Sequence, residues 1–248
     1  FDDVSAGLYQ FIWNNFCDWY LEFAKPIFLG SDEVLKSETH ATAAFVLDIA
    51  LHVMHPVMPY ITEEIVQAFR GTDYQLITAP WPKIKEEWKF LVAVEEIHWV
   101  TNVINLIRSV RAELNVPAAT NIQLIVQGAD DTIKHRLTAY KDFIFKMARV
   151  AGLAYDGTIP KDAAQAVLGN TTFVMPLAGV IDLDAERARI EKEHKKIFEE
   201  ATRLEQKLGN PQFADFAPED VVNDHRERLE QARITLANLD AAKARLQA

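Results

Sequence analysis

The feature that most constrains the fold is a seven-residue repeat of apolar side chains in the last quarter of the chain. The repeat positions are Leu183, Ile190, Ile197 and Leu204, interleaved with Arg187, His194, Ala201 and Leu208, and then Val222, His225, Leu229, Ala232, Leu236, Leu239 and Leu246. A helix with one narrow apolar seam needs a partner helix to bury that seam. Residues 182–248 are therefore predicted to form an antiparallel coiled-coil hairpin, with its turn between Gly209 and Pro218.

Two more regions precede the repeat. Apolar residues at helical spacing predict four helices, at 5–25 (closed by Pro26), 31–54, 59–71 and 85–114, which together suggest a four-helix-type bundle over residues 1–116. After Pro117, expected strands at 122–126 and 172–175 flank an expected helix at 131–149, with one or two short strands in 150–170. The predicted fold is mainly α, with a small α+β module over residues 117–181.

The formal net charge of −10 argues against a protein that binds polyanions without specificity, because such binding relies on many phosphate contacts. The excess of acidic residues lies almost entirely in residues 1–115, which hold 8 Lys and Arg against 16 Asp and Glu. Local recognition of a nucleic acid remains compatible with this distribution.

Motifs of catalysis and metal binding are not found in the sequence. It lacks the Gly-rich phosphate loops, H-E-x-x-H and G-x-S-x-G. His52 and His55 have no carboxylate or thiolate at ligand spacing, and Cys17 is the single cysteine. Glu63 and Glu64 are interpreted as solvated charges. We predict no catalytic residue, no metal site and no cofactor within the chain itself.

The sequence also bears on location and completeness. No apolar run approaches the length of a membrane span, and no basic segment followed by a short apolar stretch opens the chain, so a cytoplasmic protein is expected. The first methionine is Met54, which suggests a fragment of a longer protein.

Candidate RNA-binding residues lie on the fourth expected helix. Asn105, Arg108 and Arg111 follow one another at about one turn, on the side opposite the apolar stripe. Guanidinium groups stack on unpaired bases or bind phosphates. The alternative is that these arginines pair with acidic residues of neighbouring helices.

A second candidate set is a cationic stripe on the first hairpin helix, formed by Arg189, Lys192, Lys196 and Arg203. Such a stripe suits a nucleic-acid backbone. Because the same helix carries several glutamates, an ordinary solvated coiled-coil surface is the alternative.

Several segments resemble valyl-tRNA synthetases over nearly the full chain. The residues that carry the resemblance are Tyr9 to Trp13, Phe16 to Glu22 with Lys25-Pro26, His55 to Glu64, Ile107 to Glu113 with Pro117, Asn210 to Phe213, and Ala217 to Val222. The segment at His55 is shared by the synthetases for valine, isoleucine and leucine. The terminal hairpin is typical of the valine enzyme, and one cysteine cannot build the zinc module common in isoleucine enzymes.

The resemblance implies an anticodon-binding bundle, a coiled-coil arm on the outer corner of a valine tRNA, and a monomeric protein. For the parent enzyme it implies ATP- and Mg²⁺-dependent attachment of valine to tRNA, with editing of wrongly attached threonine, in catalytic domains absent from this sequence. Two alternatives stay open, namely the equivalent region of an isoleucine or leucine synthetase and a helical interaction module that binds no RNA.

Overall fold

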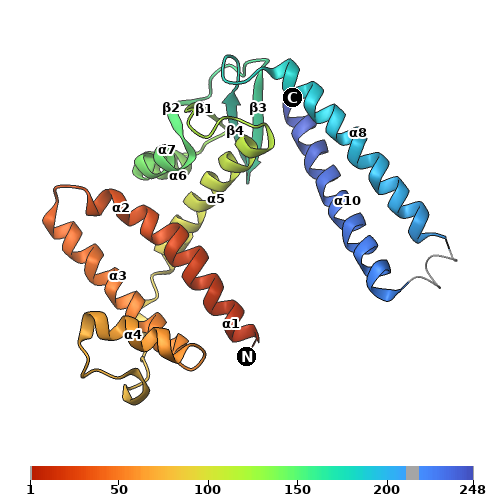
Figure 1. Ribbon diagram of the computed structural model, residues 1–248. Helices are drawn as coiled ribbons and strands as arrows, with labels where there is room; N and C mark the ends of the chain where they lie inside the picture. The colour runs from red at the N-terminus through yellow and green to blue at the C-terminus, as the bar shows by residue number, and fades with distance from the viewer. Residues whose placement is uncertain (1, 211–217, 248) are drawn as a thin grey trace. The chain divides into compact units, whose positions relative to one another are not determined.

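The computed structural model describes residues 2–210 and 218–247, and it divides into two compact units, Phe1–Val92 and Ala93–Ala248. Each unit is described by itself. The first is helical, and the second combines a helix, a four-stranded sheet with two short helices, and the terminal hairpin (Figure 1).

The first unit is built from helices joined by short turns. Its elements are α1 (Asp2–Tyr9), the π-helix η1 (Gln10–Leu21), α2 (Glu22–Phe28), α3 (Glu33–Met54), α4 (Pro59–Arg70) and the 3₁₀ turns η2 (Leu76–Thr78) and η3 (Glu86–Trp88). Asp32 caps α3 by accepting hydrogen bonds from the backbone N–H groups of Val34 and Leu35. Pro59 occupies the first turn of α4, as predicted. A small core of Leu51, Val66 and Leu76 joins α3, α4 and η2.

The prediction that Pro26 ends the first helix is wrong. Pro26 lies inside α2, and the helix continues to Phe28. Proline lacks the N–H group that a regular helix uses at this position. The wider turns of η1, which end at Leu21, already shift the hydrogen-bond register just before the proline, and such irregular turns accommodate proline in a helix.

The second unit begins with α5 (Leu91–Glu113) and continues into the sheet. The strands are β1 (Ile122–Gln127), β2 (Val150–Tyr155), β3 (Ala163–Leu168) and β4 (Thr171–Pro176), in the order β2-β1-β4-β3. β1 pairs parallel with β2 and antiparallel with β4. The parallel pair needs a crossover, which α6 (Asp131–Ala139) and α7 (Lys141–Ala148) supply.

The helix expected at 131–149 is therefore two helices. The break is at Tyr140, whose φ of −105° and ψ of 17° leave the helical region. Aromatic residues are compatible with helix, so periodicity alone does not detect this bend. One or two short strands were expected between Val150 and Asn170, and the structure has two there, β2 and β3.

Helix α5 belongs to the second unit from Ala93 onward. It starts six residues later than predicted, after η3, and its buried stripe is Val100, Val103, Ile104, Ile107 and Val110. The apolar residues Leu91, Val94 and Ile97 in the first half of the helix are exposed. The predicted domain boundary after residue 116 thus differs from the compact units, which divide after residue 92.

The helical span Glu86–Glu113 is long and apolar enough, by length and composition, to cross a membrane, and it is the one such span among the described residues. Glu95 and Glu96 lie within this span, so it is not an unbroken apolar run. In this structure the second half of α5 buries its apolar stripe within a unit that contains a sheet, as a core helix does. Length and composition alone therefore do not indicate a membrane protein here.

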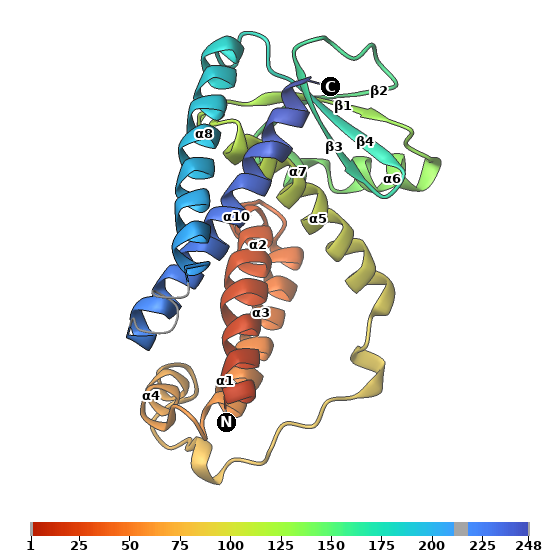
Figure 2. The same ribbon diagram turned by 90° about the vertical axis from the view of Figure 1, so that its right-hand side faces the viewer.

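The predicted hairpin is confirmed as α8 (Leu183–Leu208) packed along α10 (Glu219–Gln247), side by side in Figure 2. Its far half has a core of Ala201, Leu204, Leu229 and Ala232, with Ile197, Leu208 and Leu236 packed against it. The expected turn at 211–217 and the side chain of Leu246 lie outside the described residues. Among the repeat positions Arg187 is exposed, while Ala242, which the repeat did not include, is buried.

The near end of the hairpin, its root, is attached to the rest of the unit by polar contacts. Glu186, buried on α8, accepts a hydrogen bond from Asn115 at 3.2 Å. Arg245 of α10 pairs with the carboxylate of Glu113, and α10 packs against β3. The root is therefore fixed to the end of α5 and to the sheet, whereas the far half has a core of its own between the two hairpin helices.

Candidate RNA-binding surfaces

The polar residues of α5 do not form one outward stripe. Asn105 and Arg108 are exposed, but Arg111 is only 7 % exposed. Arg108 donates from Nε to the carbonyl oxygen of Met147 at the end of α7, at 2.9 Å. Arg108 thus combines a structural bond with an exposed position.

The contacts of Arg111 indicate a structural role. Its guanidinium donates to the carbonyl oxygens of Pro117 at 3.0 Å and Arg149 at 3.4 Å. Burial, with a smaller contribution from the nearby positive charge of Arg149, lowers the pKa of Arg111. The predicted outward position of Arg111 is wrong. Its partners are backbone carbonyls, not the acidic side chains that the alternative interpretation expected.

On the hairpin, the side chain of Arg189 also has structural partners. It pairs with Glu186 at 2.7 Å and with Glu193, and it donates to the backbone oxygen of Glu113 at 3.4 Å. Hydrogen bonding to Glu186 raises the pKa of Arg189. Arg189 therefore joins the root contacts and is not available to a ligand without breaking them.

The other three residues of the predicted stripe remain accessible. Lys192 and Lys196 are exposed and, within the described residues, have no ion pair. Arg203 is exposed and donates from Nε to the carbonyl of Glu199 at 3.1 Å. We therefore define the arm stripe as Lys192, Lys196 and Arg203.

Sequence reasoning missed two arginines of the second hairpin helix. Arg228 pairs with Glu200 at 2.9 Å, and Arg233 pairs with Glu205 at 2.8 Å. These bonds run between α8 and α10, so they neutralise glutamates that otherwise compete with the arm stripe. The sequence pattern could have identified these two pairs, because charged residues that flank an apolar seam commonly pair across a coiled coil.

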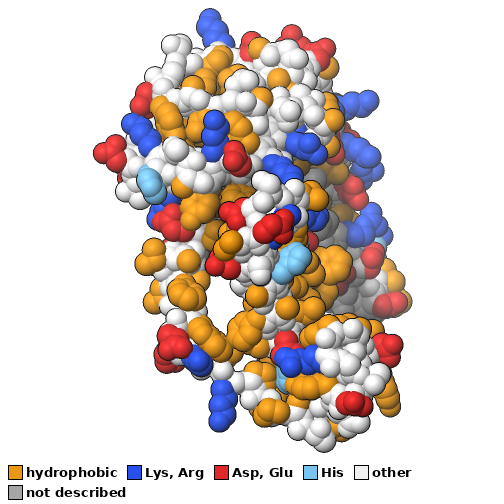
Figure 3. Space-filling model, turned by 90° about the vertical axis from the view of Figure 1, so that its left-hand side faces the viewer, with side chains coloured by type: hydrophobic (Ala, Val, Ile, Leu, Met, Phe, Trp, Pro, Cys, Tyr) orange, Lys and Arg blue, Asp and Glu red, His pale blue; other side chains and the backbone are white. Residues whose placement is uncertain are grey.

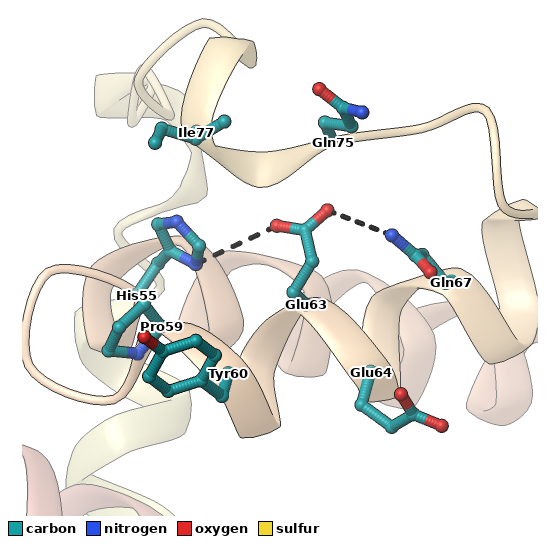
Figure 4. A pocket seen from close by; sticks show the side chains of 8 residues that line it. All are labelled: His55, Pro59, Tyr60, Glu63, Glu64, Gln67, Gln75 and Ile77. Carbon is teal, nitrogen blue, oxygen red and sulfur yellow. Dashed lines mark hydrogen bonds and ion pairs between the residues drawn. The ribbon is translucent and has the colours of Figure 1, made fainter.

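The first unit carries an open groove of about 540 Å³ on α4 and the segment that follows it (Figure 4). The ring of Tyr60, 90 % exposed, lies at its edge, and the side chains of Gln67 and Gln75 line it. Glu63 accepts a hydrogen bond from the backbone N–H of Leu76 at 3.1 Å. The prediction that Glu63 is a solvated charge is therefore wrong, although Glu64 is exposed.

Histidines near the groove have structural partners. His52 is buried, with Nδ1 at 2.8 Å from the carbonyl of Asp48 and Nε2 at 3.1 Å from the hydroxyl of Tyr74. His55 Nδ1 lies 2.9 Å from the hydroxyl of Thr62. No group of three or more metal-binding side chains occurs in the part of the chain that the structure describes. The groove thus offers an aromatic face and amide groups, with no nucleophile beside a base.

Exposed hydrophobic side chains reach the surface at many places on the face drawn in Figure 3, between charged ones. In the first unit they include Tyr9, Trp13, Tyr60, Phe69 and Trp81. Tyr9 and Trp13 stack with ring centroids 6.2 Å apart. Tyr9 and Trp13 are thus accessible at the surface of the first unit.

Comparison with known proteins decides the family. The family model described as the anticodon-binding domain of tRNA ligase matches residues 1–126. The chain belongs to this family of tRNA ligases. A second family model, described as the valyl tRNA synthetase tRNA binding arm, matches residues 182–247. The arm match coincides with the α8–α10 hairpin, and the resemblance to valyl-tRNA synthetases is confirmed.

Curated tRNA ligases show the same relationship. The chain is 41 % identical over 250 residues to the valine–tRNA ligase of Caulobacter vibrioides, 41 % identical to that of Brucella suis, and 40 % identical to that of Zymomonas mobilis. Each alignment covers 99 % of this chain but only 27–28 % of the relative. The chain therefore spans just over a quarter of the length of these ligases.

Because Lys192 and Lys196 are exposed and have no ion pair with any described residue, their reversal to glutamate is expected to weaken tRNA binding. Loss of two phosphate contacts should lower the slope of log affinity against log salt by about 2, and the affinity at least tenfold at low salt. Filter binding across a salt series measures both. The control is Lys83→Glu with Lys161→Glu, an equal charge change at exposed positions. Equal losses in both variants would mean that only net charge matters.

Proposed function

We propose that this chain is the tRNA-binding part of a valine–tRNA ligase, which holds a valine tRNA at its anticodon loop and at its outer corner. The observation that carries the proposal is that both family models match one chain, the anticodon-binding domain first and the valyl-type arm second. An isoleucine or leucine enzyme, or an interaction module without RNA, is not expected to carry this combination.

Anticodon recognition is assigned to the helical residues 1–116. Unpaired bases are read by stacking on aromatic rings and by hydrogen bonds to their edges. The groove on α4 offers the exposed ring of Tyr60 beside the side chains of Gln67 and Gln75, which suits such a base. Asn105 and Arg108 are the candidates on α5, since both are exposed. Arg111 is retained as a support for Arg108 and its surroundings.

The arm is assigned to the outer corner of the L-shaped tRNA. A helix of the length of α8 spans roughly 40 Å at 1.5 Å per residue, enough to reach well beyond the sheet. Its exposed cations, Lys192 and Lys196, are suited to phosphates. Binding energy from this remote contact would help to hold the acceptor end of the tRNA in the active site of the whole enzyme.

For the whole enzyme we propose ATP- and Mg²⁺-dependent formation of valyl-adenylate, transfer of valine to tRNA, and hydrolysis of wrongly attached threonine. These steps belong to catalytic and editing domains that this chain does not include. The chain itself is proposed to be a monomeric, cytoplasmic protein without a metal and without a membrane partner. Its contribution to the reaction is to select and position the tRNA.

A gel shift tests the proposed function directly. The purified chain should retard valine tRNA at low salt and at 0.2 M salt, and an unrelated tRNA only at low salt. The same preparation is expected to show no valine-dependent exchange of pyrophosphate into ATP. Equal retardation of both tRNAs, or none, would contradict the proposal, and pyrophosphate exchange would contradict the separation of binding from catalysis.

A further inference from the structure

The segment between the two matched families has no assigned role. The anticodon-binding model ends at residue 126, and the arm model begins at residue 182. This segment contains most of the sheet and both short helices. Its charge is unevenly distributed, because residues 134–149 hold five Lys and Arg (Lys134, Arg136, Lys141, Lys146 and Arg149) against one acidic residue, Asp142.

Four basic residues lie at or are bonded to the carboxyl end of α7, the helix that packs against β2 (Figure 1). Lys146 and Arg149 flank the carbonyl of Met147, which accepts the bond from Arg108. Arg111 reaches the carbonyl of Arg149. Lys146, Arg149 and Arg108 are exposed, and Arg111 lies beneath them. We call these four residues the α7 basic cluster.

The positive charges of Arg111, Lys146 and Arg149 are little neutralised by carboxylates. Both acceptors of Arg111 are carbonyls, which carry no full charge, and Arg149 is close enough to repel it. Lys146 and Arg149 have no ion pair among the described residues. Elsewhere in this chain, with its net charge of −10, most arginines pair with carboxylates, as Arg136 does with Glu96 at 2.7 Å. Lys146 and Arg149 therefore stand out as exposed positive charges with no carboxylate partner in the part of the chain that the structure describes.

The backbone conformation of Arg149 supports the same interpretation. Arg149 ends α7 in the left-handed conformation, with φ of 55° and ψ of 53°. Glycine adopts this conformation without cost, and it is the usual residue at such a helix end. An arginine in this conformation is less stable than a glycine, but it places a positive charge at the surface. The favourable interaction of cations with a helix end accounts for Lys146, but it does not account for an arginine where glycine fits better.

We propose that the α7 basic cluster binds the phosphate backbone of the tRNA, as a third contact in addition to those of the anticodon-binding helices and the arm. This inference rests on the proposed function. Arg149 and Lys146 supply the exposed charges, and Arg108 adds a third. Arg111 fixes the carbonyl of Arg149 and so holds the backbone from which that side chain projects.

The test uses the whole chain with Arg149→Gly, alone and combined with Lys146→Ala. Glycine removes the charge and also relieves the left-handed backbone, so the thermal midpoint should stay the same or rise. The affinity for valine tRNA should nevertheless fall, by about threefold for the single and tenfold for the double variant, and the salt slope should decrease by about 1 per charge removed. Lys161→Ala, an exposed lysine of the same segment, is the matched control and should bind like the parent.

The outcomes are distinguishable from failure of the proposed function. If the parent chain does not bind valine tRNA, the proposed function fails. If the parent binds and the Lys192→Glu, Lys196→Glu variant weakens binding, while the Arg149→Gly, Lys146→Ala variant binds like the parent, then only the third contact is overturned. A lowered thermal midpoint with unchanged affinity would likewise overturn it, because Arg149 and Lys146 would then be structural.

Discussion

Deletion of residues 197–236, with a short Gly-Ser turn joining residue 196 to residue 237, is expected to lower the affinity for valine tRNA at least tenfold. The rest of the chain is expected to stay folded. The deleted part contains the self-contained far core of Ala201, Leu204, Leu229 and Ala232. It also contains the exposed Arg203. The loss of affinity reflects the loss of the distal RNA contact.

The choice of deletion follows from the root of the hairpin. The heptad pattern alone suggests that all of 182–248 can be removed, since its seam is satisfied internally. In the structure, however, Glu186 and Ile190 are buried at the root, and Arg245 pairs with Glu113. Removal of the root would expose surface of the α+β module and leave Glu113 without its partner. The shorter deletion keeps these contacts.

Urea unfolding, followed by the fluorescence of Trp99 on α5 in chains whose other four tryptophans are replaced by phenylalanine, measures whether the second unit stays folded. The control is a chain in which the same turn replaces only residues 211–217. An unchanged unfolding midpoint with tenfold weaker binding is the expected result for the large deletion. Parent-like affinity after this deletion would mean that the far half of the arm does not contact tRNA.

Arg111→Ala is expected to destabilise the second unit by about 2–4 kcal/mol, the largest stability effect of any single arginine discussed here. A hydrogen bond to a charged group contributes about 1.5–3 kcal/mol, and truncation also leaves a cavity around a side chain that is 7 % exposed. The carbonyls of Pro117 and Arg149 lose their donors. The segments before β1 and β2 are therefore expected to loosen.

Two other variants make this result interpretable. Arg108→Ala should cost about 1 kcal/mol or less, because the side chain is exposed and its bond to the carbonyl of Met147 lies at the surface. Arg111→Lys keeps a charge but loses the fork that reaches two carbonyls, so its stability should lie between those of the parent and Arg111→Ala. Equal unfolding free energies for Arg108→Ala and Arg111→Ala, measured in urea, would show that Arg111 has no special structural role.

These two arginines illustrate what the sequence can and cannot predict. Their spacing of three correctly placed them about one turn apart on one helix. It did not reveal that the α+β module covers one side of that helix, so that one arginine is exposed and the other buried. Helical period identifies faces, but which face is covered depends on contacts distant in sequence.

The same distinction holds elsewhere in the fold. The hairpin was predictable because each heptad seam has one partner, close in sequence, that can bury it. The division of α6 from α7 at Tyr140, and the exposure of Leu91 and Val94, were not predictable, because both depend on how distant segments pack. On α8, Lys192 and Lys196 are exposed, as predicted for outward cations. Arg189 instead forms ion pairs with Glu186 and Glu193.

The central claim is that one chain holds a valine tRNA at two separate places, and hydroxyl-radical footprinting of that tRNA tests it most directly. The parent chain is expected to protect the anticodon loop and the outer corner of the tRNA. The chain that lacks residues 197–236 and also carries Lys192→Glu and Lys196→Glu, used at a concentration that restores binding, should protect the anticodon loop and leave the corner open. Loss of both protections together, or protection of neither region by the parent chain, would contradict the account.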